Sequence, residues 1–562
     1  MTYREISVAQ YLAHFLEQQS CPAAFQVSGG MIAFLSDAIE RKSATPLVHN
    51  RHEQGSGFAA EGATRISGRP ALAMATSGPG ATNLITAIAS CFFDSVPAVF
   101  ITGQVRIDEL RKDEKQRQNG FQELNITSVV QPLTKEVWMI KNASDIKAVL
   151  SAAWELCQSG RPGPVLIDIP IDVQQQMISL DENEMKTINP LRKELSKIAQ
   201  ENLNVAISVL NRAKNPIVMI GGGVRTANAT DRVKQFLQAS KFPYVSTLMG
   251  LDAVDHNSER YLGFIGSYGN RWANEALSKA DVLLVLGSRL DVRQTGTDIK
   301  AFLDKKTIIR VDIDSNELSG RVKSSIEIYA DLNCVIDQLL GSEIEAQENP
   351  LSYEATVSRK LYPQTGEQEI DLELNPNYVM EQISVKFKDA IGYIVDVGQH
   401  QMWAAQSLRI QNHQRFLTSG GLGSMGFAIP ASIGASYCST GRWVVIVGDG
   451  CLQLSIQELQ TISHYKLPIT VVVINNSQHG MVAQFQEENL EGRFTGTRDG
   501  FSNPNFKLVS EAFGFQNYTR IHSKKDLDSF VASPPLTSKG PELVEIIIDK
   551  RAKALPKMKF HS

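Results

Sequence analysis

The chain has 562 residues, of which 43% are hydrophobic and 21% charged, and its formal net charge is −4 at pH 7. This composition is that of an ordinary globular protein, and the length predicts three or four domains of roughly 150 residues each. The slightly acidic balance excludes an extended basic surface for nucleic acid, and no hydrophobic run reaches the length that spans a membrane.

The cysteines and the start of the chain bear on the cellular compartment. Six cysteines are scattered without a Cys-x-x-Cys pair, and residues 1–5 lack the apolar core of a signal peptide. Reduced thiols are therefore expected, with neither a disulfide framework nor a zinc site. We expect a cytoplasmic protein without nucleic-acid or membrane partners.

Two polar, poorly patterned stretches divide the chain into three blocks. They cover about residues 174–201 and 341–369, and both are rich in Glu, Lys, Gln and Asn, which is typical of linkers. We therefore expect domains at residues 1–175, 200–341 and 370–550.

Each block alternates short Val/Ile/Leu-rich strands with amphipathic helical segments. Continuous apolar strands that alternate with helices predict parallel sheets covered on both faces. The expected fold class is therefore α/β, with three doubly wound parallel-sheet domains. The predicted strands are residues 71–75, 98–102 and 164–169, then 216–220, 282–286 and 307–311, and finally 443–447, 469–474 and 542–548.

The third block carries the strongest chemical signal. Gly448-Asp449-Gly450 follows one strand and Asn475-Asn476 follows the next, with a crossover helix predicted over residues 452–465. Because the carboxyl ends of parallel strands share one edge, Asp449 and Asn476 would converge as oxygen ligands of a Mg²⁺ that grips a diphosphate. Taken alone, the same residues are also explained by a turn and a helix cap.

Further motifs run in order through all three blocks, and together they are far more specific than any one alone. They are His52-Glu53-Gln54-Gly55, Ser77-Gly78-Pro79-Gly80-Ala81-Thr82-Asn83, Phe121-Gln122-Glu123, Arg161-Pro162-Gly163-Pro164, Leu248-Met249-Gly250, Asp396-Val397-Gly398-Gln399-His400-Gln401-Met402 and Ser419-Gly420-Gly421-Leu422-Gly423-Ser424-Met425-Gly426. With these motifs the chain resembles the acetolactate synthase branch of the thiamine diphosphate (ThDP) enzymes over nearly its whole length. The resemblance implies a pyrimidine-binding, a middle and a diphosphate-binding domain.

The resemblance also implies that Glu53, Gln122 and Met425 are catalytic. In this family a glutamate hydrogen-bonds the aminopyrimidine ring of ThDP and shifts it to the imino tautomer that removes the C2 proton. Gln122 would contact the reaction intermediate, and Met425 would hold the cofactor bent. Outside the motifs, Glu53 would be explained as an exposed helix residue and Met425 as ordinary core.

The cofactor contacts that the resemblance implies fall in the first and third blocks. Those expected for ThDP are Gly29, Ser77, Gly78, Asn83, Gln399, His400, Gly423, Gly448, Gly450, Cys451 and Met481. The metal ligands would be Asp449, Asn476 and the backbone carbonyl of Gln478. A lone histidine such as His400 is otherwise more often structural.

The middle block resembles the FAD site of the biosynthetic acetolactate synthases, in which the flavin has no net redox role. The expected FAD residues are Gly221, Gly222, Gly223, Leu248, Met249, Gly266, Arg289, Arg293, Asp312 and Asp331. A glycine-rich turn after a strand is weak evidence by itself. A middle domain that binds nothing, or that binds an adenine nucleotide, remains an alternative.

The substrate residues implied by the resemblance are Arg289, Phe121 and Phe485. Arg289 would hold the carboxylate of the acceptor in a bidentate manner, or stack on the flavin. The sequence departs from the family around this pocket, because Phe485 replaces a tryptophan, Met31 an alanine and Ile171 a lysine, and Val292 interrupts the usual Phe-Asp-Asp-Arg. These departures put the acceptor in doubt and leave the chemistry intact.

The resemblance predicts a carboligase of the acetolactate synthase type, which decarboxylates pyruvate and transfers the hydroxyethyl (two-carbon) unit to a carbonyl acceptor. It also implies an obligate homodimer with inter-subunit active sites, or a tetramer. One alternative is the same chemistry on another ketone, such as a nucleotide-linked keto-sugar. A simple 2-keto acid decarboxylase is disfavoured because the chain has no pair of adjacent histidines. A non-catalytic sensor would not need Glu53.

Overall fold

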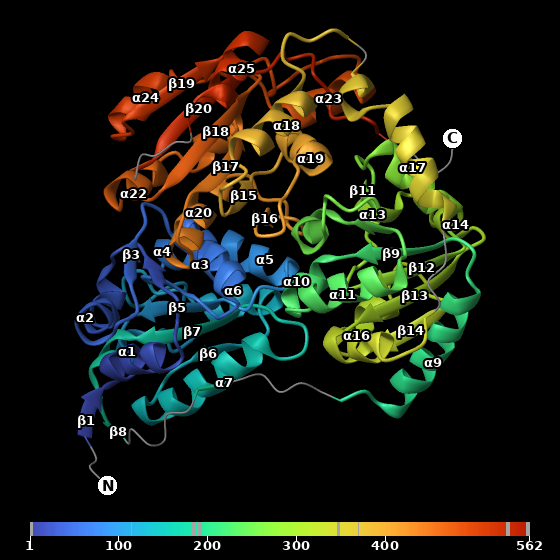
Figure 1. Cartoon of the computed structure of the whole chain (residues 1–562). Helices are drawn as coiled ribbons and strands as arrows, with labels where there is room; N and C mark the ends of the chain where they lie inside the picture. Colours follow the sequence, from blue (N-terminus) through green and yellow to red (C-terminus); the bar gives the residue numbers. More distant parts are fainter. Residues whose placement is uncertain are drawn as a thin grey trace.

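Three lobes follow one another along the chain in the computed structural model (Figure 1). The structure describes residues 4–113, 115–180, 187–188, 194–344, 349–368, 370–534 and 540–557. Each lobe contains one six-stranded sheet whose strands are all parallel. This arrangement confirms the α/β class and the doubly wound domains.

The first domain has the strand order β3-β2-β4-β5-β7-β6. Its strands are β2 (Ala24–Gln26), β3 (Leu47–His49), β4 (Leu72–Ala75), β5 (Val99–Gln104), β6 (Val137–Met139) and β7 (Val165–Pro170), and a separate antiparallel pair is formed by β1 (Arg4–Ser7) and β8 (Met177–Leu180). Its helices are α1 (Val8–Gln18), α2 (Ala33–Lys42), α3 (Glu53–Ser67), α4 (Pro79–Asn83), α5 (Ile85–Phe93), α6 (Ile126–Val130), α7 (Ile146–Gln158) and α8 (Ile171–Gln175).

The third domain repeats this strand order, as β16-β15-β17-β18-β20-β19. Its strands are β15 (Gly392–Val395), β16 (Arg415–Leu417), β17 (Trp443–Gly448), β18 (Ile469–Asn475), β19 (Asn517–Ile521) and β20 (Glu542–Ile547). Its helices are α18 (Pro376–Lys386), α19 (Gln399–Ser407), α20 (Ala428–Tyr437), α21 (Asp449–Leu454), α22 (Glu458–His464), α23 (Gly480–Asn489), α24 (Phe506–Ala512) and α25 (Lys524–Ala532).

The middle domain has a different order, β11-β10-β9-β12-β13-β14. Counted within the domain this is 3-2-1-4-5-6, the order of dinucleotide-binding folds, in which ligands bind where the order reverses. Its strands are β9 (Pro216–Ile220), β10 (Tyr244–Ser246), β11 (Tyr261–Phe264), β12 (Val282–Leu286), β13 (Thr307–Asp312) and β14 (Ile326–Tyr329). Its helices are α9 (Lys197–Arg212), α10 (Gly222–Thr226), α11 (Thr230–Ser240), α12 (Arg271–Lys279), α13 (Val292–Thr295), α14 (Ile299–Leu303), α15 (Ser315–Leu318) and α16 (Leu332–Leu340).

All nine predicted strands are present, and each boundary agrees within two residues. The prediction of one crossover helix over residues 452–465 is wrong, because the chain forms α21 and α22 with a break between them. The break turns Glu458 toward the first domain, where its carboxylate accepts backbone hydrogen bonds.

The second predicted linker is also wrong in part, because it contains α17 (Pro350–Leu361). Asn349 caps this helix, Pro350 occupies its first position, and its buried residues Leu351 and Ala355 pack beside α12. Parts of both predicted linkers, residues 181–186, 189–193, 345–348 and 369, lie outside the described residues.

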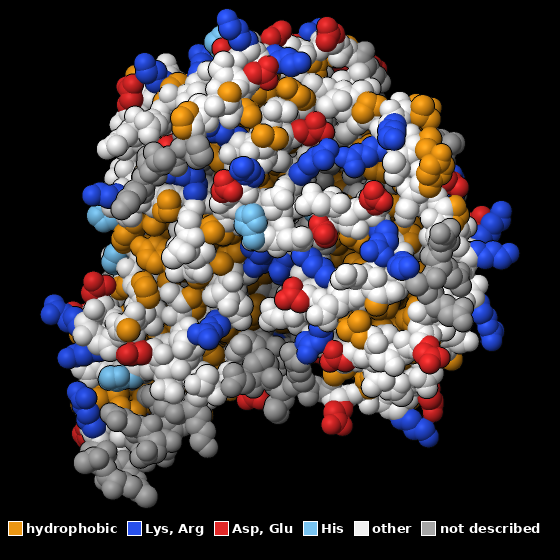
Figure 2. Space-filling model, in the orientation of Figure 1, with side chains coloured by type: hydrophobic (Ala, Val, Ile, Leu, Met, Phe, Trp, Pro, Cys, Tyr) orange, Lys and Arg blue, Asp and Glu red, His pale blue; other side chains and the backbone are white. Residues whose placement is uncertain are grey.

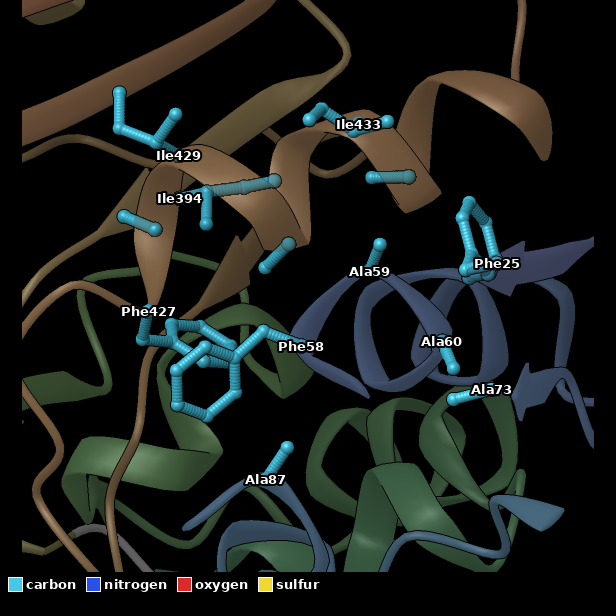
Figure 3. Packing of buried hydrophobic residues seen from close by; sticks show 14 of the residues in the cluster. Phe25, Phe58, Ala59, Ala60, Ala73, Ala87, Ile394, Phe427, Ile429 and Ile433 are labelled. Atoms are coloured by element: carbon cyan, nitrogen blue, oxygen red, sulfur yellow. The ribbon is translucent and has the colours of Figure 1, made fainter. Parts of the chain in front are cut away.

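The first and third domains meet through α3 and α20, which cross closely enough for backbone to touch backbone (Figure 3). The rings of Phe58 and Phe427 lie 5.4 Å apart at 75°, an edge-to-face contact. A Cβ on Gly62 would lie 2.1 Å from the carbonyl oxygen of Ala431, so only glycine fits there. This contact fixes the position of the first residue of α3, Glu53, relative to the third domain.

The first and middle domains are joined by ion pairs. Arg161 donates to Asp314 at 3.0 Å and to Glu317 at 2.6 Å. Charges of both signs are interspersed over the face shown in Figure 2. Among the described residues, no helix combines the length and the apolar character needed to cross a membrane.

Candidate functional site

Glu53 lies at the first position of α3, half-buried beside the loop that follows β4. Its Oε2 accepts a hydrogen bond of 2.9 Å from Nδ2 of Asn83. A Cβ on Gly80 would lie 3.3 Å from Oε1, so the glycine leaves room for the carboxylate. The structure therefore brings together Glu53 and two residues of the Ser77–Asn83 motif.

Gln122 lies against the same loop. It has a positive φ of 64°, and a Cβ on Gly78, itself at φ +62°, would be 2.9 Å from the Cβ of Gln122. The neighbouring Phe121 is 80% exposed. Ser77 is buried, and its hydroxyl has no hydrogen-bond partner among the described residues. An exposed aromatic ring and a buried hydroxyl with no partner in the described part of the chain are the features of a site shaped for a further group.

Gly29 lies next to this loop as well. A Cβ there would be 2.4 Å from the Cβ of Thr76, so close packing alone requires a glycine at this position. Thr76 Oγ1 accepts from the backbone N–H of Met31 at 3.2 Å.

Asp449 follows β17 at the carboxyl edge of the third sheet and is only 2% exposed. Its Oδ1 accepts from the backbone N–H of Gly450 at 3.0 Å, and its Oδ2 accepts from Nδ2 of Asn503 at 2.9 Å. Burial raises the pKa of Asp449 above its ordinary value, because desolvation disfavours the charged form. A cation at this position would offset that cost.

Asn476 and Gln478 lie in the turn after β18, next to Asp449 at the same edge. The Asn476 amide nitrogen donates to Oε1 of Gln399 at 3.1 Å, so the amide oxygen is the atom that can face a cation. The Gln478 side chain donates to the carbonyl of Lys550 at 2.6 Å. Asn503 donates to both Asp449 and Asn475, so Asp449 and the end of β18 lie at one edge of the sheet, and the oxygen atoms there suit Mg²⁺.

His400 is buried in the first turn of α19, against the backbone of Gly398 and Gly448. Desolvation lowers its pKa to about 3, so the ring is neutral at physiological pH. Its Nε2 has no hydrogen-bond partner among the described residues. An orphaned ring nitrogen beside the predicted diphosphate-binding turn marks a place for a further hydrogen-bonding group.

The remaining residues of this half-site have protein partners. Cys451 donates from Sγ to the carbonyl of Val397 at 3.1 Å, and a Cβ on Gly450 would lie 2.6 Å from the ring of His479. Met481 is the second residue of α23 and is half-buried. Packing within the protein therefore accounts for part of the predicted set.

Gly423 and Met425 line a pocket of about 540 Å³ between the first and third domains. His52, Gln54 and Phe58 line it from the first domain. Gly423 has φ +70°, and a Cβ there would meet nothing within 4 Å, so it faces open space. Met425 is half-buried on the edge of the core shared by both domains.

Asp396 holds the loop that carries these two residues. It is buried and accepts from the backbone N–H groups of Gly426 at 2.9 Å and Ala428 at 2.8 Å. Burial raises its pKa, and the backbone hydrogen bonds oppose this shift.

In the middle domain, Gly221 and Gly223 follow β9 at the reversal of strand order. A Cβ on Gly221 would lie 2.1 Å from the carbonyl oxygen of Gly287, and one on Gly223 would lie 2.7 Å from its Cα. Gly222 similarly approaches Met249. The glycines therefore let the loop after β9 pack on the loop after β12 and on the turn η5 (Leu248–Ala253) after β10, which accounts for all three without a ligand.

The predicted basic FAD residues lie near this reversal. Arg289 pairs with Asp291 at 3.6 Å and reaches the carbonyl of Phe93 in the first domain at 3.4 Å. A Cβ on Gly266, which has φ +117°, would lie 2.4 Å from the carbonyl oxygen of Arg293. Leu248 and Met249 begin the short 3₁₀ turn η5 (Leu248–Ala253) after β10.

The two predicted acidic FAD residues differ in their surroundings. Asp312 ends β13, and burial raises its pKa. Asp331 caps α16 by accepting from the backbone N–H of Asn333 at 2.8 Å, so helix capping explains it without a ligand.

The positions that depart from the family pattern are spread over several elements. Phe485 lies on α23 and is 55% exposed, and Val292 begins α13 and is also exposed. Met31 accepts through its carbonyl from Gln174 at 2.8 Å, and Ile171 begins α8.

Three residues of the site lie outside every motif. Asn503 bridges Asp449 and Asn475, Glu458 reaches the loop before Glu53, and Asp94 holds the backbone of the Gly420 loop. No local pattern marks them, because each acts on residues far away in the chain. Among the described residues, no group of three or more His, Cys, Asp and Glu side chains is placed to hold a metal ion.

Comparison with known families matches all three domains. The N-terminal TPP binding domain of thiamine pyrophosphate enzymes matches residues 6–129, the central domain residues 203–339 and the C-terminal TPP binding domain residues 396–546.

Individual proteins are similar over nearly the whole chain. The chain is 34% identical to the acetolactate synthase isozyme 1 large subunit of Escherichia coli, covering 99% of this chain and 96% of that protein. It is also 34% identical to the acetolactate synthase large subunit of Lactococcus lactis, over 98% and 94%, and to acetolactate synthase 2, chloroplastic, of Nicotiana tabacum, over 97% and 82%.

Proposed function

Because the chain belongs to the acetolactate synthase family of thiamine diphosphate enzymes, we propose that the two clusters described above form its active site. The protein is a ThDP-dependent carboligase of the acetolactate synthase type, which decarboxylates pyruvate and joins the two-carbon unit to a carbonyl acceptor. The observation that supports the site assignment is that Asn503 links Asp449 to Asn475 at the sheet edge where His400 Nε2 has no partner among the described residues.

Asp449, Asn476 and the carbonyl of Gln478 would hold Mg²⁺, and His400 and Gln399 would meet the diphosphate. When bound, ThDP supplies the nucleophilic carbon and the electron sink for loss of CO₂ from a 2-keto acid. Gly423 would leave room for the pyrimidine ring, and Met425 would support the cofactor.

Glu53 would hold a proton in hydrogen-bond contact with the pyrimidine ring. Asn83 already occupies its Oε2, so Oε1, beside Gly80, is the oxygen left for that contact. Gln122 and the exposed Phe121 would face the substrate, since both project from the loop that packs on Gly78.

FAD in the middle domain is part of the proposal. The 3-2-1-4-5-6 strand order supports a dinucleotide at the reversal point, where Arg289 and Arg293 carry charges suited to its phosphates. The close packing of Gly221 and Gly223 on Gly287 weakens them as evidence for FAD, since packing requires glycine there already.

A homodimer, with Glu53 and Asp449 of one site supplied by different subunits, is also proposed. In one chain the contacts of Glu53 are with Asn83 and those of Asp449 are with Asn503, so the two clusters remain separate groups. A second copy would bring an 80% exposed Phe121 into contact with protein. A reducing compartment such as the cytoplasm accords with six free cysteines.

The acceptor is proposed to be pyruvate, with a different ketone as the second candidate. The exposed Phe485 favours the second candidate, because it presents a smaller ring than the tryptophan usual in the family.

The test is product analysis from ¹³C-pyruvate with Mg²⁺, ThDP and FAD, with and without added ketones. Labelled acetolactate from pyruvate alone supports acetolactate formation, and label transferred mainly to an added ketone supports the second candidate. Glu53→Gln should lower CO₂ release by about 100-fold or more. Full turnover by this variant would disprove the role of Glu53, and wild-type protein that releases no CO₂ would disprove the function.

A further inference from the structure

Glu458, at the first position of α22 in the third domain, holds a loop of the first domain. Its Oε1 accepts from the backbone N–H groups of Arg51 at 2.9 Å and His52 at 3.1 Å. Its Oε2 accepts from Asn50 Nδ2 at 3.0 Å and Thr461 Oγ1 at 2.8 Å. The side chain is fully buried. Arg51 and His52 directly precede Glu53, so Glu458 fixes the main chain from which the catalytic side chain projects.

Asp94, which follows α5 in the first domain, holds a loop of the third domain. Its Oδ2 accepts from the backbone N–H of Gly420 at 3.0 Å, and its Oδ1 accepts from that of Gly421 at 2.6 Å. Arg65 of α3 adds a hydrogen bond of 2.8 Å to the carbonyl of Thr418, just before this loop. The loop continues to Gly423 and Met425, so Asp94 fixes the main chain that carries them.

We propose that Glu458 and Asp94 are reciprocal positioning residues of the active site, each holding the catalytic loop of the other domain by two backbone N–H bonds. This inference rests on the proposed roles of Glu53 and Met425. Within one chain the two loops meet at one pocket, which His52 and Gln54 line from one side and Gly423 and Met425 from the other. In the proposed homodimer, Glu53 and Met425 of one chain serve different sites, so each carboxylate acts on a different site. Helices α3 and α20, which flank the loops, are locked together by the packing seen in Figure 3.

The chemistry of these contacts suits positioning. A carboxylate that accepts two backbone N–H groups makes charge-assisted hydrogen bonds, which are shorter and stronger than neutral ones. Glu458 and Asp94 are occupied by these bonds to the protein, so they act through Glu53 and Met425. A catalytic group displaced by roughly 1 Å loses about 100-fold in rate, so anchors of this kind bear directly on turnover.

The experiment combines kinetics of holoenzyme variants with amide hydrogen exchange. Glu458→Ala and Asp94→Ala should each lower kcat for CO₂ release from pyruvate about 10- to 100-fold, while KM changes by less than about threefold. Glu458→Gln and Asp94→Asn each keep one acceptor oxygen, so their kcat values should fall between those of the alanine variants and wild type. This graded rescue distinguishes positioning from a general loss of structure.

Hydrogen exchange tests the contacts without reference to activity. In wild-type protein, peptides containing residues 51–52 and 420–421 should exchange slowly. Glu458→Ala should speed exchange mainly in the first peptide and Asp94→Ala mainly in the second. The wild-type amides of residues 51–52 and 420–421 decide the outcome without a folded variant. If they exchange as fast as those of an unstructured chain, the two carboxylates do not hold these loops and the proposal is overturned.

Glu317→Gln is the matched control. It removes a carboxylate of the middle domain that accepts a hydrogen bond from Arg161 of the first domain and contacts neither loop. Its kcat should remain within about twofold of wild type, because a half-exposed ion pair contributes little. Variants of Glu458 and Asp94 with kcat as high as this control would also overturn the proposal. Wild-type protein that releases no CO₂ would instead disprove the proposed function, and the exchange data would still test the anchors.

Discussion

Asp168 and Glu61 are carboxyl groups sealed inside the first domain, and burial governs their ionisation. Desolvation raises the pKa of Asp168 to about 7, against the opposing effect of hydrogen bonds from Thr102 at 2.7 Å and Gln104 at 2.9 Å. Desolvation likewise raises the pKa of Glu61 to about 7, although Arg65 lies beside it. Both groups hold a proton in the folded protein over a range of pH in which the unfolded chain has lost it.

The pH dependence of stability should reveal Asp168. Between about pH 4 and pH 7 the folded state binds one more proton at this site than the unfolded state, so the free energy of unfolding falls as pH rises. Asp168→Asn removes the contribution of Asp168 to this dependence and should be more stable than wild type above pH 7, by on the order of 4 kcal/mol. Urea unfolding at pH 4.5 and pH 8, which bracket the titration of Asp168, measures the difference in unfolding free energy between the variant and wild type.

The exposed aspartate Asp389 provides the control for this comparison. Asp389→Asn should shift the unfolding free energy by less than about 0.5 kcal/mol at either pH. An Asp168→Asn variant whose difference from wild type is the same at both pH values would contradict the buried-acid account.

Asn503 tests the metal site through an outer contact. Its amide donates to both Asp449 Oδ2 and Asn475 Oδ1, so Asn503→Ala should free Asp449 to rotate. Loss of such an outer partner typically costs about 10- to 100-fold in metal affinity, so the Mg²⁺ concentration for half-maximal activity should rise accordingly. Asn505→Ala, which removes only a cap of α24, should leave the Mg²⁺ requirement unchanged. Equal Mg²⁺ curves for the two variants would rule out this support.

Sequence motifs located the residues that act locally but not their anchors. The residues found by motifs stand at the start of a helix or just after a strand, where a sequence pattern is easy to recognise; they are Glu53, Asp449 and Asn476. Asn503, Glu458 and Asp94 contribute through contacts with distant parts of the chain, and their neighbours in sequence give no hint of this role. The resemblance implies that Asp331 contacts FAD, and its cap on α16 already explains this residue without a ligand.

At the scale of elements, hydrophobic strands were predictable and interruptions of helices were not. The strands β9 and β12 have the predicted boundaries because every residue in them is buried on both faces. The break between α21 and α22 has no Gly or Pro to mark it, since tertiary contacts of Glu458 impose it. Helix α17 was missed because exposed Tyr353 and Leu361 obscure its apolar face.

The crossing of α3 and α20 makes a prediction about stability. A Cβ on Gly434 would lie 1.8 Å from the carbonyl oxygen of Ala59, so Gly434→Ala must push two backbones apart. Overpacking of this kind costs about 1–3 kcal/mol, and we expect the free energy of unfolding to fall by that amount. Gly540, where a Cβ meets nothing within 4 Å, provides the control Gly540→Ala. Equal unfolding curves for the two variants would mean that the helices do not cross this closely.

At the scale of the whole molecule, the order of strands distinguishes the middle domain from the other two. The first and third domains share one order, and the middle domain has the order of dinucleotide-binding folds. The sequence predicted parallel sheets in all three blocks because apolar strands alternate with helices. It could not predict the order of strands, which depends on which edges the crossovers reach.

The proposed sharing of sites between subunits predicts that two inactive variants restore each other. Glu53→Gln spoils the first-domain half of a site and Asp449→Ala the third-domain half. In a mixed dimer, intact Glu53 of one chain and intact Asp449 of the other would form one complete site. After equal mixing and subunit exchange, half the dimers are mixed and each has one working site of two, so activity should recover to about a quarter of wild type.

The control for this mixing experiment is a chain that carries both substitutions. The double variant mixed with either single variant forms no site with both groups intact, so it should stay inactive. Two single variants that remain inactive after exchange, with hybrid dimers demonstrated by mass spectrometry, would mean that Glu53 and Asp449 serve one site within the same chain. Activity can return only if a complete site draws its two halves from different subunits, because neither variant chain contains both groups.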